Sequence, residues 1–182
     1  MASLLLLSAC DGLDRTATKD EPQSTTEEGQ TSERDKKLLE DLNAAGEKLV
    51  QIIKDADTEG FIRLCDSDGI GLEPDIELTI DDIRNQMRQK KGLYCLLFDT
   101  ECLQEESGND SYKSYRDLFR SAHNLKISAS LSYEFPEGRL GGVGVKWEGD
   151  PDPSEVTSGK QFPAFMFIYR NSTWKLNEII RF

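Results

Sequence analysis

The chain has 182 residues, enough for one domain with a hydrophobic core plus a tail, and too few for two comfortable domains. Its 22 Lys and Arg residues stand against 34 Asp and Glu residues, which gives a formal net charge of −12. Nucleic-acid phosphates are bound through Lys and Arg, so this balance argues against a nucleic-acid partner.

The first ten residues hold a short apolar run, Leu4 to Leu7, followed closely by Cys10. A membrane-spanning helix needs about 20 apolar residues, so this run does not span a membrane, and no later segment is long enough. The pattern Leu7-Ser8-Ala9-Cys10 resembles the lipobox of bacterial lipoproteins, in which two small residues precede the acceptor cysteine. The resemblance implies that Cys10 becomes the mature N-terminus and carries acyl chains such as palmitate, which anchor it in a membrane.

An exported, lipid-anchored protein of the cell envelope follows from this resemblance. Residues 1–9 are interpreted as a short or truncated lipoprotein signal peptide, because Met1-Ala2-Ser3 lacks the Lys or Arg of such leaders. We expect the protein on the periplasmic or extracellular side of its membrane. Asp11 resembles an inner-membrane retention signal of enteric bacteria, but the rule varies between bacterial groups, so inner and outer membrane stay open.

The lipidated cysteine is followed by a polar segment. Residues 11–34 are rich in Thr, Ser, Glu, Asp, Gly and Gln, and Leu13 is their one large aliphatic residue. Such a segment buries too little apolar surface to fold. Residues 10–34 are therefore predicted to form a disordered acidic tether, and residues 35–182 a single domain.

Helices are predicted at the start of this domain. From Asp35 to Ile53 apolar residues recur at helical spacing, with charges on the other face. Thr58 is expected to cap a second helix, Glu59 to Leu64, that forms a helical hairpin with the first. Leu72 to Leu78 is predicted to be extended, with a break at Pro74.

The middle of the domain is predicted to change from helix to strand. Thr79 and Asp82 resemble a capping box that begins a helix from Ile80 to Lys90, and Gly92 is expected to end it. Residues 93–98 are a strand candidate, residues 101–111 are predicted to be a loop, and a helix or turn is expected at Tyr115, Leu118 and Phe119.

In the last third of the chain, apolar and polar residues alternate as they do in half-buried strands. The predicted strands are residues 125–133, 142–147, 162–169 and 173–182, with a loop at 150–159 and a hairpin turn at 170–172. Helices first and a strand meander afterwards predict an α+β fold, with N-terminal helices packed on a curved antiparallel sheet.

This order resembles the NTF2-like, or cystatin-like, domains. The resemblance rests on the long first helix, the short second one, and the closing pattern Phe165 to Tyr169 followed by Trp174-Lys175-Leu176. It covers the outline of residues 35–182 and includes no diagnostic motif. It implies a binding module that holds a small ligand or a partner in the cone between sheet and helices.

Seven aromatic residues are candidates to line such a pocket, because apolar walls with polar phenol and indole tips suit small ligands. They are Tyr94, Phe98, Tyr133, Trp147, Phe165, Phe167 and Trp174. Core packing is the alternative, since alternation alone does not tell whether a sheet face meets a helix or a ligand.

A candidate calcium site is the sharpest local motif. Asp66, Asp68, Gly69 and Ile70 are followed by Glu77 at the twelfth position from Asp66, which resembles an EF-hand loop. Ile70 departs from that pattern at the fifth position, where a further oxygen ligand belongs. The preferred interpretation is an Asp/Gly turn that leads into a strand. No other cofactor is expected.

Catalytic combinations are scarce. His123 is the one histidine, so His-based metal sites and Ser-His-Asp or Cys-His catalysis lack their parts, and His123 is expected at a helix C-terminus. The glycines at 138, 141, 142 and 144 lie in a strand region and are predicted to permit a bulge or close packing rather than to bind phosphate.

Three cysteines remain if Cys10 is lipidated, which permits at most one internal disulfide. Pairing of Cys95 with Cys102 and buried free thiols both stay open.

The sequence favours a membrane-tethered, non-enzymatic domain that binds an envelope protein or a small ligand. The alternatives are an NTF2-like hydrolase or isomerase with buried carboxylates and a calcium-binding envelope protein.

Overall fold

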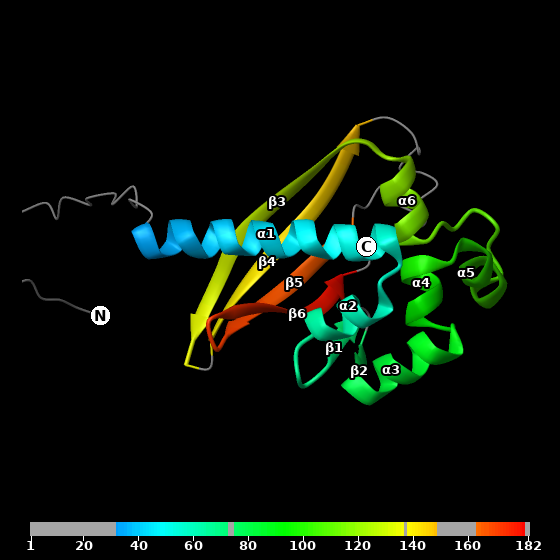
Figure 1. Cartoon of the computed structure of the whole chain (residues 1–182), viewed down its shortest axis with the longest axis horizontal. Coiled ribbons are helices and arrows are strands. Elements are labelled where there is room, and N and C mark those ends of the chain that lie inside the picture. The colour runs from blue at the N-terminus through cyan, green and yellow to red at the C-terminus, as the bar shows by residue number, and fades with distance from the viewer. Residues whose placement is uncertain (1–31, 73–74, 137, 149–162, 181–182) are drawn as a thin grey trace, which may run out of the picture. The chain divides into compact units, whose positions relative to one another are not determined.

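The structure is a computed structural model that describes residues 32–72, 75–136, 138–148 and 163–180 (Figure 1). The lipobox, nearly all of the tether and the predicted loop at 150–159 lie outside the described residues. The elements in chain order are α1 (Glu33–Asp55), α2 (Thr58–Leu64), β1 (Ile70–Leu72), β2 (Ile76–Leu78), α3 (Ile80–Gln89), α4 (Leu93–Phe98), α5 (Thr100–Ser107), α6 (Tyr115–Ser121), β3 (His123–Phe135), β4 (Gly138–Glu148), β5 (Ala164–Arg170) and β6 (Thr173–Ile180).

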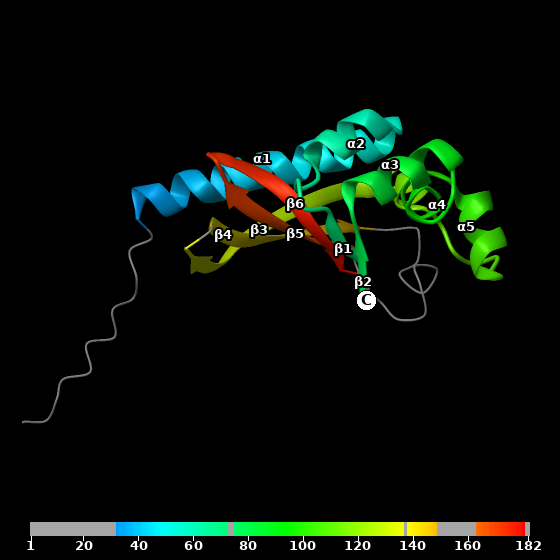
Figure 2. The same ribbon diagram turned by 90° about the horizontal axis from the view of Figure 1, so that it is seen from below.

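The strands form one six-stranded sheet in the order β2-β1-β6-β5-β4-β3. β1 and β6 run parallel, and the other neighbours are antiparallel. Helices α1 and α2 cover one face of the twisted sheet, and α3 to α6 gather near one end (Figure 2). The predicted α+β class, with helices on a mostly antiparallel sheet, is confirmed.

Helix α1 extends the predicted helix by two residues at each end. The Ser32 hydroxyl caps it by accepting a hydrogen bond from the Asp35 amide, and the helix ends where Ala56 takes a left-handed conformation (φ 54°). Leu42, Leu49 and Ile53 are fully buried along its sheet-facing side. The apolar spacing in the sequence is therefore the spacing of the buried face.

Two glycines let α1 approach the sheet closely. A Cβ on Gly46 would lie 2.6 Å from the Val143 Cγ1 atom, and a Cβ on Gly141 would collide with the Leu42 side chain. A larger residue at either position would have to displace a packed side chain. This confirms the predicted close packing for one of the β4 glycines, Gly141.

The segment from Gly92 to Ser107 differs from its prediction. Residues 93–98 form helix α4 rather than a strand, and α5 begins at Thr100 and occupies most of the predicted loop. A short apolar run has no polar positions that reveal a period, so the sequence does not distinguish a buried strand from a buried helix. Asp99 caps α5 by accepting from the Cys102 amide at 3.1 Å.

Gly92 and His123 also occupy positions other than those predicted. Helix α3 ends at Gln89 with Lys90 as its left-handed C-cap (φ 50°), and Gly92 is the N-cap of α4. His123 is the first residue of β3, because α6 ends at Ser121 with Ala122 as its extended C-cap. The segment predicted to be extended with a break at Pro74 contributes to two strands, β1 and β2, which pair antiparallel; Pro74 itself lies outside the described residues.

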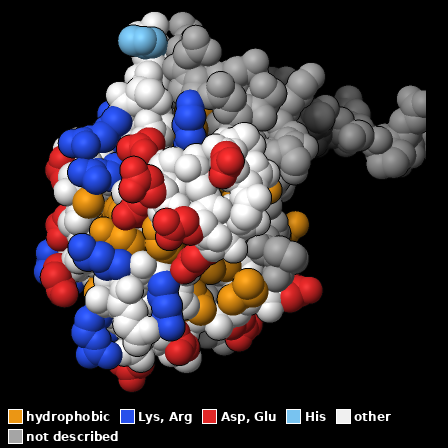
Figure 3. Space-filling view, turned by 90° about the vertical axis from the view of Figure 1, so that its right-hand side faces the viewer, with side chains coloured by type: hydrophobic (Ala, Val, Ile, Leu, Met, Phe, Trp, Pro, Cys, Tyr) orange, Lys and Arg blue, Asp and Glu red, His pale blue; other side chains and the backbone are white. Residues whose placement is uncertain are grey.

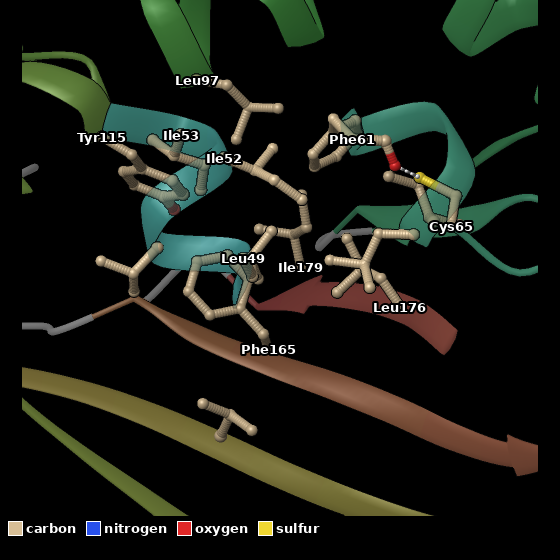
Figure 4. Close-up of a cluster of buried hydrophobic side chains, with 14 of the residues drawn as sticks. Leu49, Ile52, Ile53, Phe61, Cys65, Leu97, Tyr115, Phe165, Leu176 and Ile179 are labelled. Carbon is tan, nitrogen blue, oxygen red and sulfur yellow. Dashed lines mark hydrogen bonds between the residues drawn. The ribbon is translucent and has the colours of Figure 1, made fainter. Parts of the chain in front are cut away.

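The core lies between the sheet and the helices (Figure 4). Phe165 and Leu176 rise from β5 and β6 toward Leu49, Phe61 and the other buried residues of the helices. Edge-to-face ring pairs join Phe61 to Phe98 at 6.3 Å and Tyr115 to Phe165 at 6.0 Å. Large side chains therefore fill the layer between the helices and the sheet.

Candidate functional site

The seven predicted pocket aromatics do not gather around one cavity of the described part. Five of them, namely Phe98, Trp147, Phe165, Phe167 and Trp174, are buried core residues. Tyr94 is half-buried and packs on Phe98 at 5.5 Å between ring centroids. Tyr133 is 80% exposed on β3. The structure places most of the set in the core, which was the alternative to a ligand pocket.

Asp66 and Asp68 of the predicted calcium loop share a cation from the chain itself. The Arg170 Nη1 atom lies 3.6 Å from an oxygen of Asp66 and 3.2 Å from an oxygen of Asp68. Asp66 is buried at 3% exposure and also accepts from the Asp68 amide at 3.1 Å. A guanidinium therefore supplies the positive charge that these two carboxylates need.

The backbone here follows the preferred interpretation of the motif, an Asp/Gly turn that leads into a strand. The Gly69 amide donates to the Asp66 carbonyl at 3.1 Å, and Gly69 has a φ of 113°. β1 begins at the next residue. Glu77 lies on β2 opposite Gly71, and it lines an open groove of about 420 Å³ together with Asp68. The groove lining does not include Asp66, so the three predicted ligands do not share it.

Buried carboxylates are the requirement of the enzymatic alternative. Among the residues that the structure describes, Asp66 is the one buried Asp or Glu, and its partner is Arg170. An acid and a base that work together need two groups converging on one substrate. No second buried acid is present in the described part to join Asp66.

The three cysteines that the structure describes divide into a bonded pair and a buried thiol. Cys95 of α4 and Cys102 of α5 form a disulfide, with their Cα atoms 5.2 Å apart. Glu106 lies beside this pair, and its carboxylate accepts from the Gly92 amide at 2.9 Å. Because both sulfurs are bonded to each other, the three residues do not offer thiolates to a metal.

Cys65 is a buried residue of the core, and its thiol donates a hydrogen bond to the Phe61 carbonyl at 3.3 Å (Figure 4). Burial raises the pKa of this thiol from 9.0 to about 12, although the nearby Lys175 charge lowers it somewhat. We expect native Cys65 to resist alkylation by iodoacetamide at neutral pH and to react once the chain is unfolded in denaturant. Rapid labelling of the folded protein would contradict its burial.

The same pKa shift makes stability depend on pH. The unfolded thiol ionises near pH 9 and the folded thiol near 12, so its stabilising contribution is complete below pH 9 and is lost as the pH rises toward 12. Other groups also titrate there, so the readout is the difference between wild type and Cys65→Ala. The wild type is expected to lose more stability over this interval than the variant.

A second groove lies between α1 and β3. It has a volume of about 460 Å³ and is lined by Leu39, Glu40, Asn43, Ala44, Glu47, Ile127, Ser128 and Ala129. Its floor belongs to β3, the last strand of the sheet. The sequence did not point to this surface, because it arises from a helix and a strand about 85 positions apart.

Charge on the surface is mixed in sign. The side that carries α4 to α6 shows acidic and basic side chains interspersed with hydrophobic ones (Figure 3). None of the described helices combines the length and hydropathy required to cross a membrane.

No family model and no curated protein sequence matches this chain. A solved structure named Rd1NTF2_05, in a form with five substitutions, is similar to it with 9% sequence identity and a TM-score of 0.38. The similarity covers 81% of this chain and 95% of that one. A likeness at this TM-score carries no argument about the function.

Proposed function

We propose that this chain is an exported bacterial lipoprotein whose α+β domain is a non-enzymatic binding module, held at a membrane surface through lipidated Cys10. The observation that carries the proposal is the sequence Leu7-Ser8-Ala9-Cys10 after a leucine run and before an acidic polar segment. Acyl chains on Cys10 would anchor the domain, and residues 11–34 would separate it from the lipid headgroups.

The disulfide supports export independently of the lipobox. Disulfides persist in oxidising compartments and are rare in the reducing cytosol. Cys95–Cys102 joins two short helices at the end of the domain where α4 and α5 lie. In the cytosol this pair would be expected to stay reduced.

The filled core supports recognition of a partner at the surface over a ligand in the cone. The rings of Phe98, Trp147 and Phe165 all lie in the buried layer. The long first helix, the short second one and the closing strand meander support the NTF2-like resemblance, although helices α3 to α6 stand between the β1–β2 hairpin and the meander. We infer that the partner is a protein of the envelope, recognised through the domain surface.

The anchor is tested by producing the full chain in a bacterial host fed labelled palmitate. We expect label in the wild type and in the matched control Ser8→Ala, which keeps a small residue in the lipobox, and no label in Cys10→Ala. An unlabelled wild type refutes the lipoprotein proposal.

The binding role is tested by crosslinking the wild-type lipoprotein in its native host and identifying what co-purifies. The proposal expects one envelope protein at constant stoichiometry, and the same protein should be lost from a Cys10→Ala strain that no longer reaches the membrane. Absence of any specific crosslink in the anchored wild type would contradict a protein partner.

A further inference from the structure

Among the residues that the structure describes, β3 is an edge strand of the sheet. It pairs with β4 on one side, and no described strand pairs with its other side. Figures 1 and 2 show β3 as the outermost strand of the meander. A free strand edge offers a row of backbone donors and acceptors to another chain.

The centre of this edge lacks the features that usually prevent such pairing. Register irregularities fall between His123 and Lys126 and between Leu131 and Glu134, so the ladder is regular from Lys126 to Leu131. Residues 127–131 contain no charge and no proline. Native proteins commonly protect edge strands with charges, prolines or bulges. In β3 such features flank residues 127–131 on both sides, and the five residues themselves have none of them.

This stretch is self-complementary. Ile127-Ser128-Ala129-Ser130-Leu131 has the same residue types on both sides of Ala129. In an antiparallel pairing with a second copy centred on Ala129, Ile127 faces Leu131 of the second copy and Ser128 faces its Ser130. Like residues therefore meet on both faces of the joined sheet.

The alternation of burial agrees with this pairing. Ile127, Ala129 and Leu131 are half-buried on the helix side, and Ser128 and Ser130 are exposed on the other side. The groove of about 460 Å³ between α1 and β3 is lined by Ile127 and Ala129 of this same stretch. In the paired arrangement, Ala129 and Leu131 of the second copy would enter that groove beside Leu39 and Ala44 of α1.

No like charges meet in this register. Lys126 would face Ser132 of the second copy and lie diagonally from its Glu134, which pairs with Arg34 of its own chain at 3.2 Å. The two-fold axis repeats this arrangement. A centre at Ala129 or at Ser128 keeps five residue pairs inside the regular ladder, whereas a centre at Ser130 keeps three. Of the first two, Ala129 is the centre that places Ile127 opposite Leu131.

We propose that the β3 edge is a self-association surface, on which a second copy of this chain adds its own β3 antiparallel about Ala129 and joins the two sheets into one. This inference does not depend on the lipid anchor.

The test uses two variants at the exposed positions 128 and 130 of the full chain, with Cys10→Ser to keep lipid off. Ser128→Lys with Ser130→Lys places like charges opposite each other in the proposed pairing. Ser128→Lys with Ser130→Glu places opposite charges there, and both variants change the same two positions of the folded monomer. In a pairing centred on position 130, by contrast, the glutamate introduced at position 130 would face the same glutamate of the second copy, so two like charges would meet.

Sedimentation velocity over a concentration series gives the dissociation constant of the dimer. We expect a monomer–dimer equilibrium for the Cys10→Ser chain, a dissociation constant raised about tenfold by the Lys/Lys variant, and recovery in the Lys/Glu variant. Melting curves establish that both variants fold. A monomer at every concentration overturns the proposal, as does equal dimerisation of the two variants.

The acidic rim of the groove, Glu40 and Glu47, makes a basic extended peptide the competing occupant. A synthetic peptide of alternating Val and Lys is the probe. Tight binding of this peptide to a chain that stays monomeric would also overturn self-association.

Discussion

Replacing Phe165 with Ala is expected to lower the free energy of unfolding by about 3–5 kcal/mol. Phe165 is fully buried at the centre of the sheet, opposite Val143 on β4 and Ile179 on β6. Its ring meets Tyr115 edge to face (Figure 4). Removal of the ring leaves a cavity in a layer held by helices and sheet together, so neighbouring side chains have little freedom to fill it.

Urea unfolding followed by tryptophan fluorescence measures this loss. Met166→Ala is the matched control, because Met166 is the next residue on the same strand and its half-buried side chain lies on the opposite face. We expect the control to lose less than half as much. Equal losses for the two variants would mean that the helix-facing side of the sheet is not the principal core.

Replacing Arg170 with Ala is expected to cost about 3 kcal/mol, the lower end of the range for breaking a buried ion pair. Asp66 would stay buried without its cation, and the hydrogen bond from Arg170 to Asp68 would also be lost. The lower end applies because the Arg170 side chain is 33% exposed, so solvent screens part of its attraction to Asp66.

The double variant Asp66→Asn, Arg170→Met is the control, since it removes the buried charge together with its cation and leaves only Asp68, whose side chain is 80% exposed to solvent, without this partner. We expect it to be more stable than Arg170→Ala alone. A double variant at least as unstable as the single one would show that the guanidinium acts through packing rather than through charge.

The same proteins test the calcium prediction. It requires the wild-type melting temperature to rise in millimolar calcium and to fall back with chelator. A rise confined to Arg170→Ala would show that the guanidinium takes the place of a metal ion. No shift in either protein would end the calcium prediction.

Local patterns predicted the elements that carry their own signals. The apolar spacing of α1, the capping box of Thr79 and Asp82 and the alternation in β3 each correspond to an observed element. The same reasoning failed for α4, whose run Leu93–Phe98 is apolar at nearly every position. Such a run shows burial without showing which partner covers it.

The candidate surfaces were less predictable than the elements. The Asp66 motif could be found in the sequence, but its partner Arg170 lies about 100 positions later and is brought there by β5. The aromatic set was recognisable as apolar strand residues, and only the packing of helices on the sheet decided that Phe98, Trp147 and Phe165 are core.

The sequence by itself determined the lipobox-like pattern on which the proposal rests, the acidic segment behind it, the α+β class and the strand meander, because each is encoded in neighbouring residues. The tertiary structure alone decided the pairing of Cys95 with Cys102, the ion pair of Asp66 with Arg170, and the open edge at Ile127–Leu131. These depend on which segments meet in space. A strand becomes an edge only when the order of strands in the sheet is settled, and no local pattern contains that order.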